Sequence, residues 1–416
     1  MKRLIILLFT AAVLFSCIFS LNIAAGEEQI GMDLSGFNQK YYSRFYSDNI
    51  TIYVYGWNRY VSPDSEEFQN VIKAFEDLTG IKVVLTAFDS NEDMYSQISK
   101  ESTYYDIIIP SDYIVSRLVK EDRLASLNFD NIPNMNNVDD DFKGSDCAYD
   151  KNNVHSVPYA WSVLGLVCNT KSVDEKDSDT WNVLWNSNYS DKIIMTDNSR
   201  DAFAIAETLL GFSVNTEKSE ELDKAAKKLE EQKSLVSLYV GAVSQDNLEK
   251  ANVFPCYACD YLALSEKNPD LRFSIPKEGT VLSEGALCIL KDSESKEASE
   301  MFINFMCEPD VSAVIFSSSG YSTPMSSARE LMDENKANNQ AAYPSNEVMA
   351  KTQVYASLSD EATRIIDNYW ARILHTNPLN TTFWTVVAVV AVAIVVVVLV
   401  VVTNKNKKMV ARNEAA

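Results

Sequence analysis

Histidine is almost absent from this chain. Only two occur in its 416 residues, His155 and His375, and we interpret neither as functional because they stand far apart. The sequence also lacks the GxSxG and HExxH motifs, a phosphate-binding loop, and a Cys/His pair at a recognised nucleophile–base spacing. These absences argue against an enzyme, and we predict no catalytic residue, no metal site and no cofactor.

Basic residues are too few to balance the acidic ones. The chain has 58 aspartates and glutamates against 37 lysines and arginines, a formal net charge of -21. An acidic surface repels nucleic acids and anionic lipids and concentrates cations near clefts, so we expect no nucleic-acid partner. An acidic surface can also simply keep a protein soluble. The net charge does not decide between attraction of a cationic ligand and solubility.

The N-terminal segment has the features of a secretory signal peptide. Residues 1–26 combine a basic start, an apolar middle and a small-residue exit at Ala24–Gly26. Cys17 loosely resembles a lipoprotein processing site, although bulky Phe15 before it makes lipidation the less favoured alternative. We therefore expect the middle of the chain to lie outside the cytoplasm.

A second apolar segment lies near the C-terminus, where Phe383–Val402 contains no charged residue. It is long enough to span a bilayer as a helix, and its valine-rich sequence indicates an anchor rather than a channel. The basic tail 403–416 follows, which places the C-terminus in the cytoplasm by the positive-inside rule. We predict a single-pass membrane protein whose ectodomain, extracellular or periplasmic, is joined to its anchor by the linker 377–382.

Cysteines outside the signal peptide leave two questions open. An exported protein can pair some of them in disulfides, but the sequence does not define the pairing. Two of them have the spacing of a redox motif without a thioredoxin-like context, and half-buried structural cysteines are the alternative. The residues are Cys147, Cys168, Cys256, Cys259, Cys288 and Cys307, of which Cys256 and Cys259 form the motif.

Strand-like runs alternate with amphipathic helical stretches, which is the pattern of an α/β protein. Residues 154–169 form an extended stretch long enough to cross between two lobes. Strands are also predicted at 50–57, 81–88 and 192–197, and helices at 64–79, ending at Gly80, and at 357–374.

Four predicted strand ends carry polar or aromatic residues: 56–60, 110–113, 196–201 and 256–260. In α/β proteins, functional side chains lie at the C-terminal ends of strands, where loops open into a crevice. Carboxylates neutralise ammonium groups through charge-assisted hydrogen bonds, and aromatic faces cover methylenes and attract cations. The pattern favours a cleft for a flexible organic cation, although any single ring at a strand end is also compatible with packing.

Over residues 50–370 the chain resembles the spermidine/putrescine-binding proteins of ABC importers. The resemblance rests on segments that are specific together and weak alone: YGWNRYV, YDIIIPSDY, VPYAWSVLGLVCN, TDNSRDAF, IPKEGT, FINFM-x-EPDV and GYSTP. It implies a type II two-lobed periplasmic-binding-protein fold that closes on its ligand about a hinge. The implied lobes are 50–162 with 284–335 and 163–283 with 336–376, after an N-terminal extension at 27–49, with crossings near Trp161–Ser162 and Ser283–Glu284.

The resemblance also implies ligand-binding residues. Aromatic rings would enclose a methylene chain, Ser111 would contribute a hydroxyl, and Asp201 would meet an ammonium end. Tyr355 falls near the last contact of the family. The complete set is Trp57, Asn58, Tyr60, Ser111, Asp112, Tyr113, Asn198, Asp201, Tyr257, Glu284, Tyr321 and Tyr355.

Two departures from the family's pattern change the expected charge of the site. Asn198 occupies a position where some members have a second aspartate. Arg59 stands where a glutamate is often found beside Trp57, and it adds a positive charge near a cleft proposed for cations.

Two more departures fall at 283 and 285. Ser283 and Gly285 occupy the positions of an aromatic residue and of an aspartate that grips an amine. Glu284 is offset by one residue, which on a strand points its side chain to the opposite face, so it replaces that aspartate only if the loop shifts. Asp112, beside Ser111, is the other acid that could compensate.

From these observations we predict the extracellular substrate-binding component of an ABC importer, which captures a polyamine and delivers it to a permease and an ATPase. A binding protein for another small cation or zwitterion, or a membrane-anchored sensor or adhesin that reuses the fold, are the alternatives. Other polar and aromatic residues are interpreted as structural: Asp106 and Asp197 as caps, Asp260 as the cap of a helix near Tyr261, and Trp161 as hinge packing.

Overall fold

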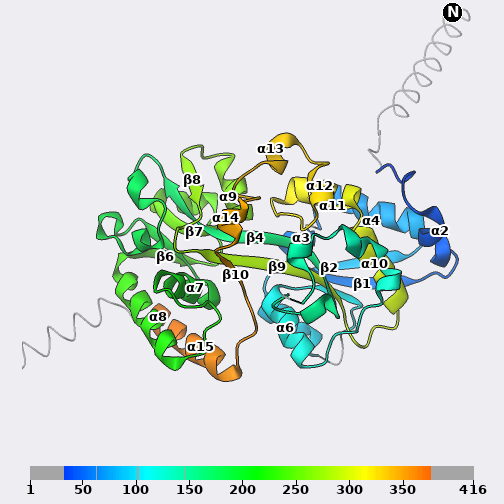
Figure 1. Ribbon diagram of the computed structural model, residues 1–416, viewed down its shortest axis with the longest axis horizontal. Coiled ribbons are helices and arrows are strands. Elements are labelled where there is room, and N and C mark those ends of the chain that lie inside the picture. Colours follow the sequence, from blue (N-terminus) through cyan, green and yellow to red (C-terminus); the bar gives the residue numbers. More distant parts are fainter. Residues whose placement is uncertain (1–31, 62, 101–102, 146, 376–416) are drawn as a thin grey trace, which may run out of the picture.

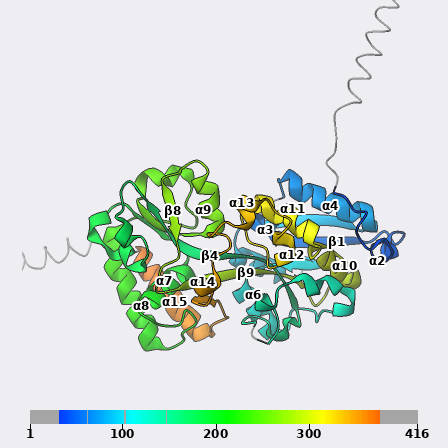
Figure 2. The ribbon, with the colours of Figure 1, turned by 45° about the horizontal axis from the view of Figure 1, so that its top comes forward.

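The computed structural model describes residues 32–61, 63–100, 103–145 and 147–375. It has an α/β fold with two lobes (Figure 1). We call the lobe built around β1, β2 and β3 lobe one, and the lobe built around β5, β6 and β7 lobe two. Figure 2 shows β4 and β9 running from one lobe to the other.

One mixed sheet continues through both lobes in the order β2-β1-β3-β9-β4-β7-β5-β6, with β10 beside β9 and β8 beside β4. The strands are β1 (Thr51–Trp57), β2 (Lys82–Phe88), β3 (Ile107–Ile109), β4 (Ser156–Asn169), β5 (Ile193–Thr196), β6 (Val236–Val240), β7 (Val253–Tyr257), β8 (Leu271–Ser274), β9 (Thr280–Ile289) and β10 (Thr352–Val354). The predicted strands at 50–57, 81–88 and 192–197 correspond to β1, β2 and β5.

The two long strands carry the connection between the lobes. The first part of β4 pairs antiparallel with β9, and its second part, Leu164–Cys168, pairs with β7 of lobe two. The C-terminal end of β9 pairs with β3 of lobe one. All but the last residue of β4 are buried, which explains why 154–169 is so continuously apolar.

Helices cover the sheet, and capping residues in the sequence mark where they begin and end. In α4, the Ser65 side chain accepts the Phe68 N–H at the start, and Gly80 ends the helix with a φ of 73°. The helices are α2 (Gln39–Tyr42), α3 (Asn58–Val61), α4 (Glu66–Thr79), α5 (Asn91–Ile98), α6 (Asp112–Lys120), α7 (Ser199–Leu209), α8 (Ser219–Gln232), α9 (Ala258–Ser265), α10 (Lys296–Met306), α11 (Pro309–Ser319), α12 (Ser326–Arg329), α13 (Glu334–Ala337), α14 (Asn346–Met349) and α15 (Asp360–His375).

Each lobe has its own hydrophobic core. Phe75, Phe302 and Phe305 pack together in lobe one, whereas Trp181 and Phe203 lie in the core of lobe two. The chain passes between the lobes a third time at β10, which pairs with β9, before α15 packs on α7 and α8. The residue boundaries that we predicted for the lobes stay a prediction.

The N-terminal extension contributes to the core of lobe one. Tyr42 in α2 is fully buried, donates its hydroxyl to Glu308 Oε1 at 2.7 Å and accepts from Asn304 Nδ2 at 2.8 Å. Residues 37–45 therefore belong structurally to this lobe.

The predicted signal peptide, with Cys17, and the predicted anchor Phe383–Val402 lie outside the described residues. Within the described ranges, no helix is both long enough and apolar enough to cross a membrane. In the same ranges the cysteines Cys147, Cys168, Cys256, Cys259, Cys288 and Cys307 are free thiols.

Candidate functional site

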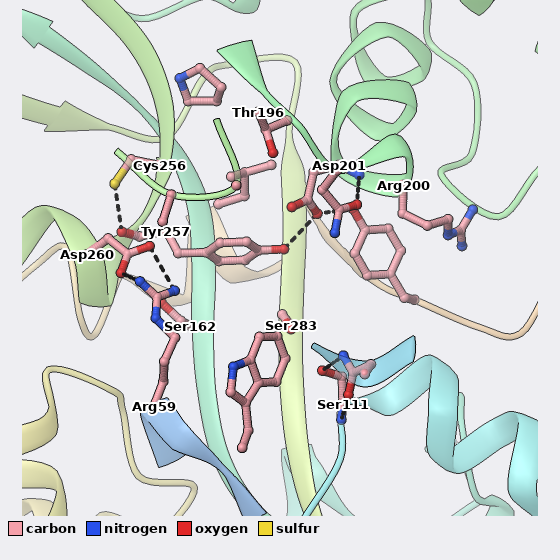
Figure 3. Close-up of a pocket in the computed structure, with 18 of the residues that line it drawn as sticks. Arg59, Ser111, Ser162, Thr196, Arg200, Asp201, Cys256, Tyr257, Asp260 and Ser283 are labelled. Atoms are coloured by element: carbon pink, nitrogen blue, oxygen red, sulfur yellow. Dashed lines mark hydrogen bonds and ion pairs between the residues drawn. The ribbon is translucent and has the colours of Figure 1, made fainter. Parts of the chain in front are cut away.

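A cleft of about 130 Å³ lies between the lobes, on one face of β4 and β9 (Figure 3). It forms where several strands end: β1 at Trp57, β3 before Ser111, β5 at Thr196 and β7 at Tyr257. The predicted site residues that line the cleft are Trp57, Tyr60, Ser111, Tyr113, Asn198, Asp201, Tyr257, Tyr321 and Tyr355.

Asp201 supplies a buried carboxylate in lobe two. Asn198 caps α7 and accepts the Asp201 N–H at 3.1 Å, which holds the residue at the start of the helix. Asp201 is 7% exposed, and its Oδ1 accepts hydroxyl hydrogen bonds from Tyr257 at 2.9 Å and Tyr355 at 2.8 Å. No described residue donates to Oδ2, so this oxygen is available to a ligand in the cleft.

The surroundings of Asp201 have two opposite effects on the pKa of its carboxyl group. Burial raises the pKa of the carboxyl above its ordinary value, while the Tyr355 and Tyr257 hydroxyls and the Arg200 guanidinium lower it. A cation bound at Oδ2 would add to the second effect and favour the carboxylate.

Arg59 forms an ion pair with Asp260 at the other end of the cleft. One guanidinium nitrogen donates to Asp260 Oδ2 at 3.1 Å and the other contacts Oδ1. Our interpretation of Asp260 as a helix cap is wrong, because α9 begins at Ala258 with Tyr257 as its N-cap. The pair largely neutralises the charge that Arg59 was expected to add.

Aromatic rings form a wall beside this ion pair. The rings of Trp57 and Tyr60 lie 5.4 Å apart, and Tyr60 meets Tyr321 edge-on at 4.9 Å. Tyr60 is buried, so its ring position is set by packing. These rings offer the apolar and π surfaces that were expected around an organic cation.

Gly285 is small because Tyr60 occupies the space above it. A Cβ at Gly285 would lie 2.4 Å from Tyr60 Cε2, closer than carbon atoms can pack. Ser283 does line the cleft, on the same face of β9. The Tyr60 ring therefore occupies the space that a side chain at position 285 would need.

Three predicted site residues lie outside the cleft lining. Asn58 donates its Nδ2 to Asp89 at 3.2 Å. Asp112 is fully buried, and its two oxygens accept the backbone N–H groups of Tyr113 and Glu284 at 2.7 and 3.1 Å. Glu284 points to the opposite face of β9, as its one-residue offset implied. Neither acid supplies a second carboxylate to the cleft.

The sequence reasoning missed several lining residues. Arg200 stacks its guanidinium 4.7 Å from the Tyr355 ring and donates to Val214 O and Asn215 Oδ1. Asn91, which donates to Ser111 Oγ at 2.9 Å, follows the end of β2. Val240 ends β6, and the loop 241–243 follows it. Asn91 and the loop after β6 both follow the ends of strands. The strand-end pattern that identified the other site residues could therefore have identified these two as well, but we did not apply it to β2 and β6.

The formal charges of the described residues that line the cleft cancel. Arg59 and Arg200 carry two positive charges, and Asp201 and Asp260 carry two negative ones. The cleft is therefore less acidic than the surface of the chain as a whole, and Asp201 is its one carboxylate with a free oxygen among the described residues.

The Cys256–Cys259 motif does not have the character of a redox site. Both thiols are buried, and burial raises the pKa of each, to about 12 for Cys259. Reactive cysteines need a lowered pKa, because the thiolate is the nucleophile. Cys256 acts instead as an apolar part of the cleft wall.

Two other residues have structural roles, although Asp106 caps none of the described helices. Asp106 accepts the Tyr53 N–H at 2.9 Å and the hydroxyls of Tyr104 and Ser293 at 2.7 and 2.6 Å. Trp161 lies outside the cleft lining and packs in the hinge with Leu282 and Tyr343.

Comparison with known proteins connects the fold and the cleft to a family. Residues 102–352 match the family described as bacterial extracellular solute-binding protein. A spermidine/putrescine-binding periplasmic protein of Salmonella typhimurium is 30% identical over 334 residues, covering 79% of this chain and 92% of that protein. A putrescine/agmatine-binding protein of Pseudomonas aeruginosa is 24% identical over 341 residues, covering 78% of this chain and 91% of that protein.

Solved structures agree with this result. The spermidine/putrescine ABC transporter substrate-binding protein of Streptococcus pneumoniae superposes with a TM-score of 0.70 at 28% identity, covering 78% of this chain and 98% of that one. A lipoprotein of Treponema pallidum has a TM-score of 0.67 at 23% identity and shares the fold, covering 78% and 99%. These relatives are named as binding proteins or lipoproteins, and none is named as an enzyme.

Proposed function

Because the chain belongs to the bacterial extracellular solute-binding protein family, we propose that it is the substrate-binding component of an ABC importer and captures a small organic cation of the polyamine type. The observation that carries this proposal is the buried Asp201 carboxylate, whose Oδ2 is free in a cleft between two lobes. The names of the relatives support the ligand class. In this proposal the protein binds and delivers its ligand without chemical change.

Asp201 Oδ2 would receive an ammonium group in a charge-assisted hydrogen bond, with Tyr257 and Tyr355 holding the carboxylate in place. The methylene chain would then lie against Trp57, Tyr60 and Tyr113. Because Asp201 belongs to lobe two and these rings to lobe one, the ligand would favour the closed arrangement about β4 and β9.

A zwitterion is a second candidate ligand, favoured by the balanced charge of the cleft. Arg59 and Arg200 both line it, and among the described residues no carboxylate takes the place of the aspartate that the resemblance implies at position 285. A ligand with an amine at one end and a carboxylate at the other would pair with Asp201 and approach an arginine. A polyamine would instead place its second ammonium near Asp260.

Calorimetric titration of the full chain with putrescine and 4-aminobutanoate separates the two ligands. The compounds have the same chain length and differ only at one end. We expect putrescine and spermidine to bind with roughly micromolar affinity, and choline and arginine to bind more weakly. Tighter binding of 4-aminobutanoate would favour the zwitterion, and the absence of binding by all of these amines would contradict the proposal.

We also propose that Phe383–Val402 anchors the protein beside its permease. The charge-free segment and the basic tail behind it support a transmembrane tether with a cytoplasmic C-terminus. A tether raises the effective concentration of the lobes at the permease without any new contact. We expect the full chain in the membrane fraction after high-salt and carbonate washes. Its recovery in the soluble fraction would contradict the anchor.

A further inference from the structure

A second and larger cavity, of about 560 Å³, lies on the opposite face of the two crossing strands. We call it the back cavity, and its floor is formed by Trp161 on β4, Leu282 and Glu284 on β9 and Val354 on β10. Trp161 and Glu284 are partners in the antiparallel register, as are Ser162 and Ser283. Side chains alternate between the faces of a strand, so the first pair faces the back cavity and the second pair faces the cleft.

Aromatic rings line the back cavity in fixed positions. The Trp161 ring lies 5.5 Å from Phe142 and 5.8 Å from Tyr343, which it meets edge-on at 82°. The Trp161 Nε1–H donates to Thr323 O at 3.0 Å, and the Tyr343 hydroxyl accepts the Thr323 N–H at 3.2 Å. These bonds orient both rings before any ligand arrives.

Glu284 brings a buried carboxylate to this aromatic surface. It is 6% exposed, and no lysine, arginine or histidine of the described chain forms an ion pair with it. Burial raises the pKa of Glu284 to about 7, and the neighbouring Tyr149 hydroxyl only partly opposes this shift. An uncompensated buried carboxylate facing a cavity is stabilised by a cation that enters it.

The other charges around the back cavity do not neutralise Glu284. Arg329 stacks on the Tyr343 ring at 4.3 Å and donates its Nε to Ala337 O. Asp139 accepts from the Ser326 N–H and hydroxyl, and Asp141 is exposed at the rim. Among the described residues, the lining therefore has three carboxylates and one guanidinium, an excess of negative charge that the cleft does not have.

We propose that the back cavity is a second binding site, which takes a small organic monocation, a protonated amine or a quaternary ammonium, between its aromatic rings and the Glu284 carboxylate. Aromatic faces and a carboxylate together select such a cation over a neutral or anionic compound. The site is separate from the cleft because the β4–β9 ribbon lies between them.

Tetramethylammonium chloride is the probe for this site, titrated into the full chain against sodium chloride of the same ionic strength. Calorimetry and tryptophan fluorescence should both report saturable binding. Glu284→Gln should weaken it about tenfold or more, because the charged partner is lost while the side-chain shape is kept. Asp140→Asn removes the same charge from an exposed neighbouring residue that does not line the back cavity, and it should change the affinity less than about twofold.

Asp201→Asn separates this site from the cleft, and it should leave tetramethylammonium binding unchanged. Binding that disappears in Asp201→Asn and persists in Glu284→Gln would place the probe in the cleft and overturn the proposal. Absence of saturable binding by the unmodified chain would overturn it as well. Neither result bears on the polyamine proposal, which is tested with its own ligands.

The pH dependence gives a second readout that needs no variant. Tetramethylammonium does not titrate, so its affinity should follow the charge of Glu284 and rise about tenfold from about pH 6 to about pH 8. The other titratable or charged groups near Glu284 are Asp112, Tyr149, Cys147, Asp139, Asp141 and Arg329. Glu284→Gln should remove the dependence, and a pH-independent affinity in the unmodified chain would contradict the role of Glu284.

Discussion

Asp201→Asn should weaken amine binding in the cleft by about 100-fold or more, or about 3 kcal/mol. The substitution keeps an oxygen that can accept the Tyr257 and Tyr355 hydroxyls, so the start of α7 should remain folded. It removes the negative charge that faces the ligand, and no other carboxylate of the described chain offers a free oxygen to the cleft. Calorimetric titration of the full chain with putrescine measures the loss.

Asp197→Asn is the matched control for this prediction. Asp197 follows the same strand, β5, and the substitution removes the same charge. The Asp197 side chain, however, is exposed and does not line the cleft. We expect its effect on affinity to be less than about twofold. An equal loss of affinity in both variants would mean that the overall electrostatic potential of lobe two attracts the amine, and that a direct contact with Asp201 does not.

Glu207→Met should stabilise the fold by roughly 3 kcal/mol at pH 7. Glu207 lies in α7 with 0% exposure, and neither of its carboxylate oxygens has a hydrogen-bond partner among the described residues. Burial raises its pKa to about 8 from an ordinary value of 4.5. Methionine has a similar shape and needs no partner, so the substitution removes the cost of keeping this group in the core.

The sign of this effect depends on pH. In the unfolded chain Glu207 ionises above its ordinary pKa of 4.5, whereas in the folded chain it keeps its proton up to about pH 8. Folding therefore becomes less favourable as the pH rises from 4.5 to about 8, and the cost is constant above that. The stability gained by Glu207→Met should accordingly be larger at pH 8 than at pH 5.

Urea unfolding of the full chain at these two pH values tests the prediction. Glu231→Met is the control, because Glu231 is exposed on the neighbouring helix α8 and should show no pH-dependent gain. A gain in Glu207→Met that is equal at both pH values would show that the benefit comes from apolar burial and not from the ionisation. A loss of stability would show that the carboxylate has a structural partner.

The approximate position of the cleft could be predicted from the sequence. Trp57, Ser111, Asp201 and Tyr257 belong to four separate segments, yet each follows a predicted strand. The carboxyl ends of neighbouring parallel strands open on the same edge of a sheet, so a local pattern was enough to bring them together. The limits of α4 were equally local, because Ser65 and Gly80 are capping residues.

The charge balance of the cleft could not be predicted in the same way. Arg59 and Asp260 form an ion pair between residues 201 positions apart, and Gly285 is small because of a ring at Tyr60. No periodicity or motif predicts such a contact, because the contact depends on how helices and strands that are distant in sequence pack against one another. The resemblance implied a carboxylate at position 285, and only the packing showed that the Tyr60 ring occupies this space.

The sequence by itself determined the alternation of strands and helices, the strand ends that carry the cleft, and the opposite faces of Ser283 and Glu284. These features depend on backbone periodicity and on neighbours within a few residues. The tertiary structure alone decided which charges are paired, which of the acids Asp112, Asp201 and Glu284 faces the cleft, and that a second cavity lies behind the hinge. Burial and contacts between distant segments set these properties, and neither exists until the chain has folded.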